Sequence, residues 1–132
     1  MNALVIDTSS WISWLGGAGS PLVEPALEDG LVHLPPVVAA ELLSGRLSTR
    51  HRRELQGLLD DLPLVEADRA HWYRVGRLRS GLRAAGLSVS TPDAHVAQCA
   101  LDLGAELLTE DRIFRALARH APLRLLEPDQ AS

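Results

Sequence analysis

The chain has 132 residues, of which 46% are hydrophobic, and its formal net charge is −4. This length suffices for one domain with its own core, which we expect to span residues 1–132, and the hydrophobic content excludes an intrinsically disordered chain. The mild negative charge argues against nucleic-acid binding driven by charge alone, although metal ions can offset acidic groups locally.

Cysteine content and apolar runs bear on the compartment. Cys99 is the single cysteine, so the chain forms no internal disulfide, as is usual in a reducing compartment. The N-terminus lacks the basic and apolar regions of a signal peptide, and no apolar run reaches the ~20 residues of a membrane span. We therefore expect a cytoplasmic protein that makes no membrane contact, with Cys99 packed inside a helix.

Short apolar runs alternate with helical patterns along the chain. The predicted strands are 3–6, 31–34, 62–65, 106–109 and 123–126. The predicted helices are 9–15, 21–27, 37–44, 48–59, 68–85, 91–103 (capped by Thr91) and 112–119. This alternation predicts an α/β domain with a central, mostly parallel sheet of about four to five strands and helices on both faces.

Four acidic residues lie where such a sheet would gather them. Asp7 directly follows the first predicted strand, and Asp111 follows the fourth after one intervening residue. Glu41 lies one helical turn after the second strand, and Asp93 lies in the first turn of the sixth helix. Because the carboxyl ends of parallel strands share one edge, where ligands bind, we expect these four side chains to converge.

Helix capping is the competing interpretation for three of these acids. Asp7, Asp93 and Asp111 each stand where a carboxylate can bind free helix N–H groups or oppose the helix dipole. For Asp7, however, the hydroxyl groups of residues 8–10 could cap the helix equally well.

Glu41 is harder to explain by capping, since apolar residues surround it in P-P-V-V-A-A-E-L-L. We expect a buried carboxylate, whose cost of several kcal/mol predicts a compensating cation, with a solvent-facing side chain as the alternative. Four carboxylates without a Cys or His cluster favour Mg²⁺ or Mn²⁺ over Zn²⁺. Such an ion activates water for attack on phosphates, so the residues alone predict metal-assisted phosphoryl chemistry.

Four segments, in this order, resemble the PIN-domain family: V-I-D-T-S, P-P-V-V-A-A-E-L-L, D-A-H-V-A-Q-C-A-L and L-L-T-E-D-R-I-F. The resemblance covers nearly the whole chain, whose small size is similar to that of the VapC-type toxins. It implies a three-layer PIN-like fold and an Mg²⁺- or Mn²⁺-dependent endoribonuclease, the toxin of a toxin–antitoxin pair. Asp7, Glu41, Asp93 and Asp111 then form the four-acid catalytic site.

The resemblance further implies that Asp7 and Asp93 bind the metal directly, and that Glu41 and Asp111 act partly through water. A water held by the metal attacks the phosphodiester, one carboxylate takes its proton, and the products carry 5′-phosphate and 3′-hydroxyl ends. The hydroxyl groups expected to orient acids or ligand waters are those of Thr8, Ser9 and Thr109.

Some relatives carry a further acid soon after the third one, where this chain has His95 and Val96. The number of metal ions, one or two, and a contribution from Glu110 therefore stay open. We expect His95 near the rim of the site rather than in catalysis.

The resemblance also implies partners: an RNA substrate, a second copy of the chain in a homodimer, and a cognate antitoxin that directs an arginine toward the acids. Trp11 and Trp14, three residues apart on one helix, line either the antitoxin groove or the dimer surface, or else pack in the core. Arg112 and Arg46 are candidate RNA contacts, with solvated surface positions as the alternative.

Other functions fit less well. Phosphatases with a nucleophilic aspartate carry a second one two residues later, where this chain has Ser9. Both these enzymes and receiver-like regulatory domains use a lysine, and all 13 basic residues of this chain other than histidine are arginine. The alternative that stays open is a PIN fold without catalytic activity that binds RNA or a protein partner.

Overall fold

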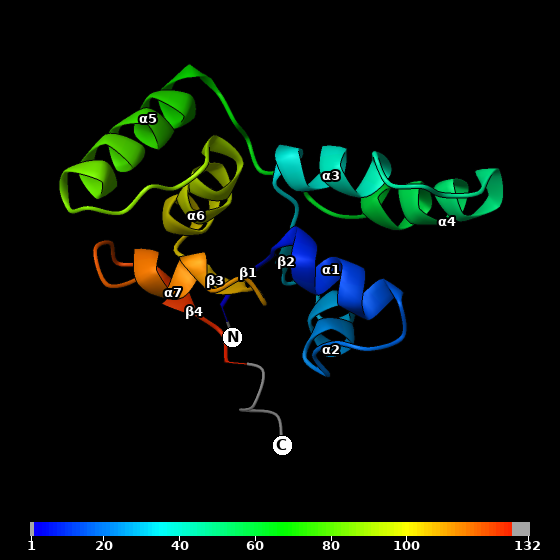
Figure 1. Ribbon diagram of the computed structural model, residues 1–132. Helices are drawn as coiled ribbons and strands as arrows, with labels where there is room; N and C mark the ends of the chain where they lie inside the picture. Colours follow the sequence, from blue (N-terminus) through cyan, green and yellow to red (C-terminus); the bar gives the residue numbers. More distant parts are fainter. Residues whose placement is uncertain (1, 128–132) are drawn as a thin grey trace.

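The computed structural model describes residues 2–127, which form a four-stranded parallel sheet surrounded by helices (Figure 1). The strands are β1 (Leu4–Ile6), β2 (Val32–His33), β3 (Glu106–Leu108) and β4 (Arg124–Leu125). The helices are α1 (Thr8–Leu15), α2 (Val23–Glu28), α3 (Pro36–Leu43), α4 (Thr49–Asp60), α5 (Arg69–Ala84), α6 (Thr91–Leu103) and α7 (Ile113–Leu117). The predicted α/β class with a parallel sheet is confirmed.

The strand order β2-β1-β3-β4 puts the first strand of the chain in the middle of the sheet. Leu4 pairs with Val32 on one side and with Glu106 on the other. The chain therefore continues from β1 to β2 at one edge of the sheet and then crosses to β3 on the other side of β1. The strand order thus reverses between β1 and β3. Ligands of open parallel sheets bind at such a point.

Helix α6 forms the centre of the core. It packs against β1 and β3 on one side and against α5 on the other, and Figure 1 shows α5 outside α6. Seven consecutive residues, 94–100, are buried, and the small side chains of Ala94, Ala97 and Ala100 let the neighbouring elements approach closely. Trp11 of α1 is also fully buried, so core packing is the correct interpretation for this tryptophan.

The prediction of a strand at 62–65 is wrong, because this segment forms only an isolated bridge between Leu34 and Leu64. Leu34 donates its N–H to the Pro63 carbonyl and accepts from the Val65 N–H. Proline has no N–H, and Pro35 and Pro63 flank this contact, so a longer ladder cannot form.

No helix in the described range 2–127 is long and apolar enough to cross a membrane.

Candidate active site

Asp7 lies at the carboxyl end of β1, where its N–H extends the sheet by donating to the Leu108 carbonyl at 2.9 Å. It occupies the N-cap position of α1, but within the described residues its side chain caps no N–H group of that helix. Instead, Oδ2 accepts hydrogen bonds from Thr109 Oγ1 at 2.9 Å and from Ser9 Oγ at 3.2 Å. The capping interpretation of Asp7 is therefore wrong.

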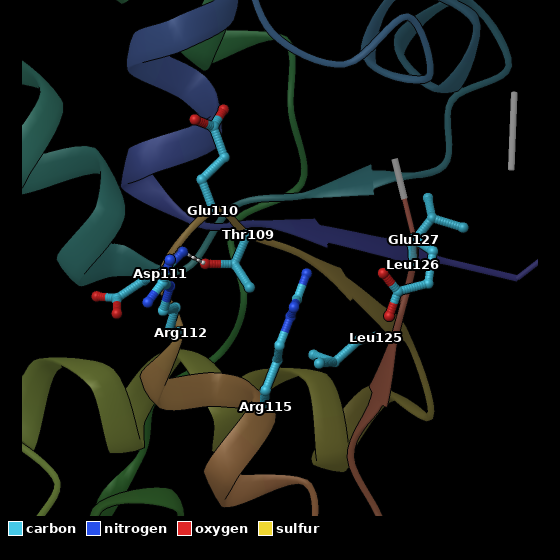
Figure 2. A pocket seen from close by; sticks show the side chains of 8 residues that line it. All are labelled: Thr109, Glu110, Asp111, Arg112, Arg115, Leu125, Leu126 and Glu127. Carbon is cyan, nitrogen blue, oxygen red and sulfur yellow. Dashed lines mark hydrogen bonds between the residues drawn. The ribbon is translucent and has the colours of Figure 1, made fainter. Parts of the chain in front are cut away.

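The same two hydroxyl groups join the loop after β3 to α1. Ser9 Oγ accepts from the Glu110 N–H at 3.1 Å, and Thr109 Oγ1 accepts from the Asp111 N–H at 3.0 Å. Figure 2 shows the latter contact, with the carboxylates of Glu110 and Asp111 pointing in different directions. The loop is thereby fixed next to Asp7.

Asp111 does act as a cap, since its Oδ1 accepts a hydrogen bond from the Ile113 N–H at 3.1 Å at the start of α7. This bond leaves the second carboxylate oxygen exposed beside the loop. Capping and a role in the site are therefore compatible for this residue.

Asp93 lies in the first turn of α6 with a half-buried side chain. The cap of this helix is Ser90, whose Oγ accepts from the Asp93 N–H at 3.2 Å, so the prediction of Thr91 as the cap is wrong. Burial raises the pKa of Asp93, and the negative charges of Asp111 and Glu41 raise it further.

The expectation of a buried Glu41 is wrong, because its side chain faces solvent. The apolar neighbours Val38 and Leu42 point into the core, whereas Ala40 lies beside Glu41 on the exposed side of α3. Glu41 Oε1 nevertheless accepts a hydrogen bond from Thr8 Oγ1 at 2.8 Å. This contact holds the Glu41 carboxylate next to Thr8, the residue that follows Asp7.

The electrostatics show that the four acids share one region. Burial raises the pKa of Asp7 against the opposing hydrogen bonds from Thr109 and Ser9, and the charge of Asp93 adds to the rise. The charges of Asp111 and Glu41 raise the pKa of Asp93 in turn, so Asp93 lies near all three of the other acids. Such mutual repulsion is relieved by a bound cation.

The donor set fits a hard divalent cation. Both hydroxyl groups bind Oδ2 of Asp7, so they leave Oδ1 for another partner. Across residues 2–127, no three of these acids bring their oxygens within 4.8 Å of one another. Mg²⁺ keeps several water molecules and is commonly held by only one or two carboxylates, so the fit rests on the oxygen donors and not on a preformed cluster.

A pocket of about 310 Å³ adjoins Asp111 between the loop, α7 and β4 (Figure 2). Arg112 and Arg115 both line it, and Figure 2 shows the Arg115 side chain extending into it. Sequence reasoning missed Arg115, although its spacing of three residues from Arg112 places both on one helix side. Arg46 is exposed between α3 and α4, outside the set of residues that line this pocket.

The placement of His95 near the site rim is wrong. Its ring is fully buried on α6 and lies against His71 of α5, with Cys99 one turn further along. Cys99 is buried inside its helix, as predicted.

The comparisons with known proteins agree with this geometry. The PIN domain family matches residues 4–120. Ribonuclease VapC11 of Mycobacterium tuberculosis and VapC ribonuclease Mb1587 of Mycobacterium bovis are each 30% identical over 123 residues, which cover 88% of this chain and 92% of the relative.

Two solved structures share the fold. The DNA-bound VapBC of Salmonella typhimurium aligns with a TM-score of 0.80 and 20% identity over 97% of this chain and 99% of that chain. VapBC-5 of Mycobacterium tuberculosis aligns with a TM-score of 0.68 and 24% identity over 96% and 99%. With a family match over most of its length and near-complete alignments to VapC ribonucleases, the chain belongs to the PIN-domain family, in its VapC branch.

Proposed function

We propose that this protein is an Mg²⁺- or Mn²⁺-dependent endoribonuclease that acts in the cytoplasm as the toxin of a toxin–antitoxin pair. The observation that carries the proposal is the buried Asp7 carboxylate, oriented by two hydroxyl groups at the point where the strand order reverses. The mutual repulsion among the acids and the ribonuclease names of the relatives support it.

Asp7 and Asp93 would hold the metal directly, and Glu41 and Asp111 would act partly through water. When bound, the ion would lower the pKa of a water molecule and offset the charge that develops on the phosphate. Whether the site holds one ion or two depends on Glu110. Its N–H is held by Ser9, but its side chain is exposed.

The protein side chains would orient the reactants and accept a proton. Thr109 and Ser9 fix the Asp7 carboxylate, and Thr8 fixes Glu41. One of the four carboxylates would take the proton of the attacking water, and half-burial leaves Asp93 accessible to that water. The phosphodiester would be cut to leave 5′-phosphate and 3′-hydroxyl ends.

Arg112 and Arg115 would contact RNA phosphates beside the scissile bond. They line the pocket next to Asp111 and bring positive charge to an otherwise acidic region. Arginine binds phosphate through several N–H groups at once, which favours it for this role.

The protein partners would be a second copy of the chain and a cognate antitoxin. Solved relatives of the same fold are VapBC toxin–antitoxin complexes, which supports the second partner. An antitoxin arginine directed at the four acids would be attracted by their charge.

The substitution Asp7→Asn tests the proposal. It keeps the shape of the side chain but removes its charge, so RNA cleavage with Mg²⁺ or Mn²⁺ should fall to background while the circular dichroism spectrum stays unchanged. The control is Asp29→Asn, an exposed residue at the end of α2, which should cleave like the wild type. EDTA should stop cleavage by the wild type, and Mn²⁺ should restore it.

Wild-type cleavage by Asp7→Asn would overturn the assignment. A wild-type protein that binds RNA or the antitoxin but cuts no RNA with either ion would instead be the binding module left open by the sequence.

A further inference from the structure

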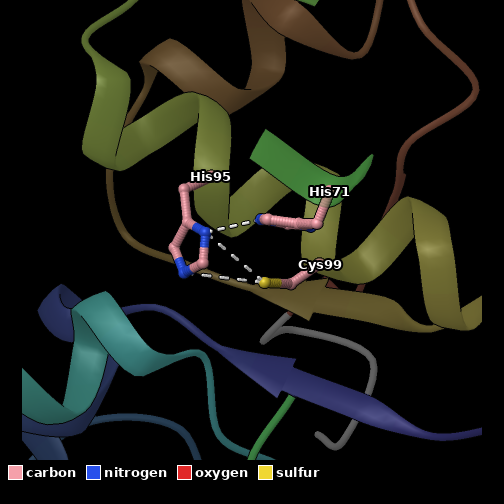
Figure 3. Close-up of side chains that lie close together, drawn as sticks. All are labelled: His71, His95 and Cys99. Carbon is pink, nitrogen blue, oxygen red and sulfur yellow. Dashed lines mark hydrogen bonds between the residues drawn. The ribbon is translucent and has the colours of Figure 1, made fainter. Parts of the chain in front are cut away.

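A second cluster of metal-ligand side chains lies between α5 and α6, apart from the four acids. His71 Nε2 lies 2.7 Å from His95 Nδ1, and Cys99 Sγ lies 3.9 Å from His95 Nδ1 and 3.7 Å from Nε2 (Figure 3). One ligand atom from each residue fits within 4.8 Å of the others, and all three side chains are fully buried.

Asp102 fixes which nitrogen of His71 faces the cluster. Its Oδ2 lies 2.9 Å from His71 Nδ1, and since a carboxylate only accepts, Nδ1 is the donor. Arg74 and Gln98 hold Asp102 in turn, with N–O distances between 2.8 and 3.0 Å. A histidine that ligates a metal typically donates its other N–H to a carboxylate in this way.

Trp72 shields the cluster. Its ring stacks on His95 with a centroid distance of 4.6 Å and an interplanar angle of 10°. This packing fixes the orientation of the imidazole and keeps water from that face, two features that favour a defined ligand geometry.

We propose that His71, His95 and Cys99 form a second metal site, which binds a borderline transition-metal ion such as Zn²⁺. Two imidazole nitrogens and one sulfur select such an ion over Mg²⁺. Three protein ligands leave the fourth position of a tetrahedral ion to a water molecule.

The distances are close to those that such an ion requires. Bond lengths of about 2.0–2.1 Å to nitrogen and about 2.3 Å to sulfur put tetrahedral ligands about 3.3 Å (N···N) and about 3.6 Å (N···S) apart. Cys99 Sγ lies 3.9 Å from His95 Nδ1, the nitrogen that faces His71, so this pair must move closer by a few tenths of an ångström. The two rings must separate, because the ion takes the place of the proton that His95 Nδ1 now shares with His71 Nε2. That proton moves to His95 Nε2, which gives up the hydrogen bond it accepts from the Val37 N–H at 3.5 Å, and the Cys99 thiol releases its proton to solvent.

Such an ion would join α5 to α6, the helix that also carries Asp93. Binding to the folded state alone would stabilise that state by RT ln(1 + c/Kd), where c is the concentration of the free ion, so the melting temperature should rise with the logarithm of the ion concentration. The proposal does not depend on ribonuclease activity.

Co²⁺ serves as the spectroscopic probe, added to metal-free protein in an excess of Mg²⁺ that occupies the acidic site. We expect one equivalent of Co²⁺ to give a thiolate-to-metal charge-transfer band together with the intense visible bands of a tetrahedral ion, and Zn²⁺ to displace both. Cys99 is the only cysteine of the chain, so the charge-transfer band can arise only there. Its absence from the folded wild-type protein would overturn the proposal.

Two variants locate the ion. Cys99→Ser should lose the charge-transfer band but retain Mg²⁺-dependent RNA cleavage, and His71→Gln should bind Co²⁺ at least tenfold more weakly. Asp7→Asn is the matched control: it should keep the band while it loses cleavage, which separates this proposal from the proposed function. A band that survives in Cys99→Ser or disappears in Asp7→Asn would place the ion elsewhere; if Cys99→Ser does not fold, the wild-type titration decides.

Discussion

Asp7 is only 6% exposed, yet its carboxylate must be ionised if it is to hold the proposed cation. Burial raises its pKa, whereas the hydroxyl groups of Thr109 and Ser9 lower it by donating hydrogen bonds to the charged form. Both groups bind one oxygen, so they fix the carboxylate plane as well. The two hydroxyls therefore act on the charge and the orientation of Asp7 at once.

The substitution Thr109→Val should separate this support from the acids themselves. Valine keeps the shape of threonine but removes the donor to Asp7, so we expect the Mg²⁺ concentration for half-maximal cleavage to rise by about tenfold to a hundredfold. Titration of the cleavage rate with Mg²⁺ measures this. Thr49→Val, at an exposed position at the start of α4, is the matched control. An unchanged Mg²⁺ requirement would show that Thr109 does not position the ligand.

For individual residues, the hydroxyl groups that bind Asp7 were predicted correctly, whereas the burial of Glu41 was predicted wrongly. The hydroxyl residues Ser9 and Thr109 were predicted from the resemblance to the PIN-domain family, and both bind the Asp7 carboxylate. Glu41 was expected to be buried because apolar residues surround it in sequence, but the exposed Ala40 beside it shows that small apolar residues do not define a buried face.

The pair of buried histidines illustrates a second limit. His71 and His95 are 24 residues apart on different helices, and each sits alone in its own apolar pattern. Their contact follows from the packing of α5 on α6, which neither helical periodicity nor a local motif encodes.

Elements with clear end signals were predicted best. The bounds of α6 agree with the prediction at both ends, since Thr91-Pro92 begins the helix and Gly104, with φ of 62°, ends it. The segment 62–65 was predicted less well, because a strand depends on a partner. Pro63 in this segment and Pro35 beside the partner residue Leu34 permit only one bridge. Helix signals are local, whereas strand signals need tertiary pairing.

Asp102 connects α6 to α5 through Arg74 and His71, and Gln98 of its own helix binds it as well. Burial acts to raise the pKa of Asp102, but the hydrogen bonds from these three residues outweigh it and lower the pKa to about 2. The side chain is 21% exposed, so solvent screens the ion pair only in part. The two helices are therefore held together by a charged contact at the edge of a buried cluster.

This contact predicts a component of acid unfolding. The pKa of Asp102 is lower in the folded state than its ordinary value of 3.8, so the unfolded chain takes up the proton first as the pH falls. Its contribution to stability is complete above pH 3.8 and is lost as the pH falls through about 2. Asp102→Asn should lack this component and should be less stable at neutral pH by about 1 kcal/mol, because Asp102 lies at the surface, where solvent screens its charge.

Urea unfolding of metal-free protein at a series of pH values measures both effects. Asp61→Asn, an exposed residue at the end of α4, serves as the control and should follow the wild-type curve. If Asp102→Asn has the same dependence on pH as the wild type, Asp102 does not link the two helices through its charge.

On the scale of the whole molecule, the four acids and a partly apolar groove lie at different ends of α1. The acids gather around Asp7 at its beginning, while Trp14 and Leu15 at its end line a cavity of about 430 Å³ together with Leu55 and Leu58 of α4. Leu15 is 46% exposed and Trp14 is half-buried, so neither is satisfied by the core alone. A helix or extended segment of the proposed antitoxin could bury both and continue toward the acids along α1.

A substitution in this groove is therefore expected to weaken antitoxin binding and to leave the rate of RNA cleavage unchanged. Leu15→Asp puts a charge where an apolar contact is proposed, and it should weaken antitoxin binding by at least tenfold, since burying an unpaired carboxylate costs several kcal/mol. RNA cleavage in the absence of antitoxin should stay at the wild-type rate, because Leu15 lies two helical turns from Asp7. Calorimetric titration with the proposed antitoxin measures the first effect. Leu103→Asp, a substitution at another partly exposed leucine, is the control. Equal antitoxin affinity of Leu15→Asp and the wild type would exclude this groove and leave the surface around the four acids as the place where the partner binds.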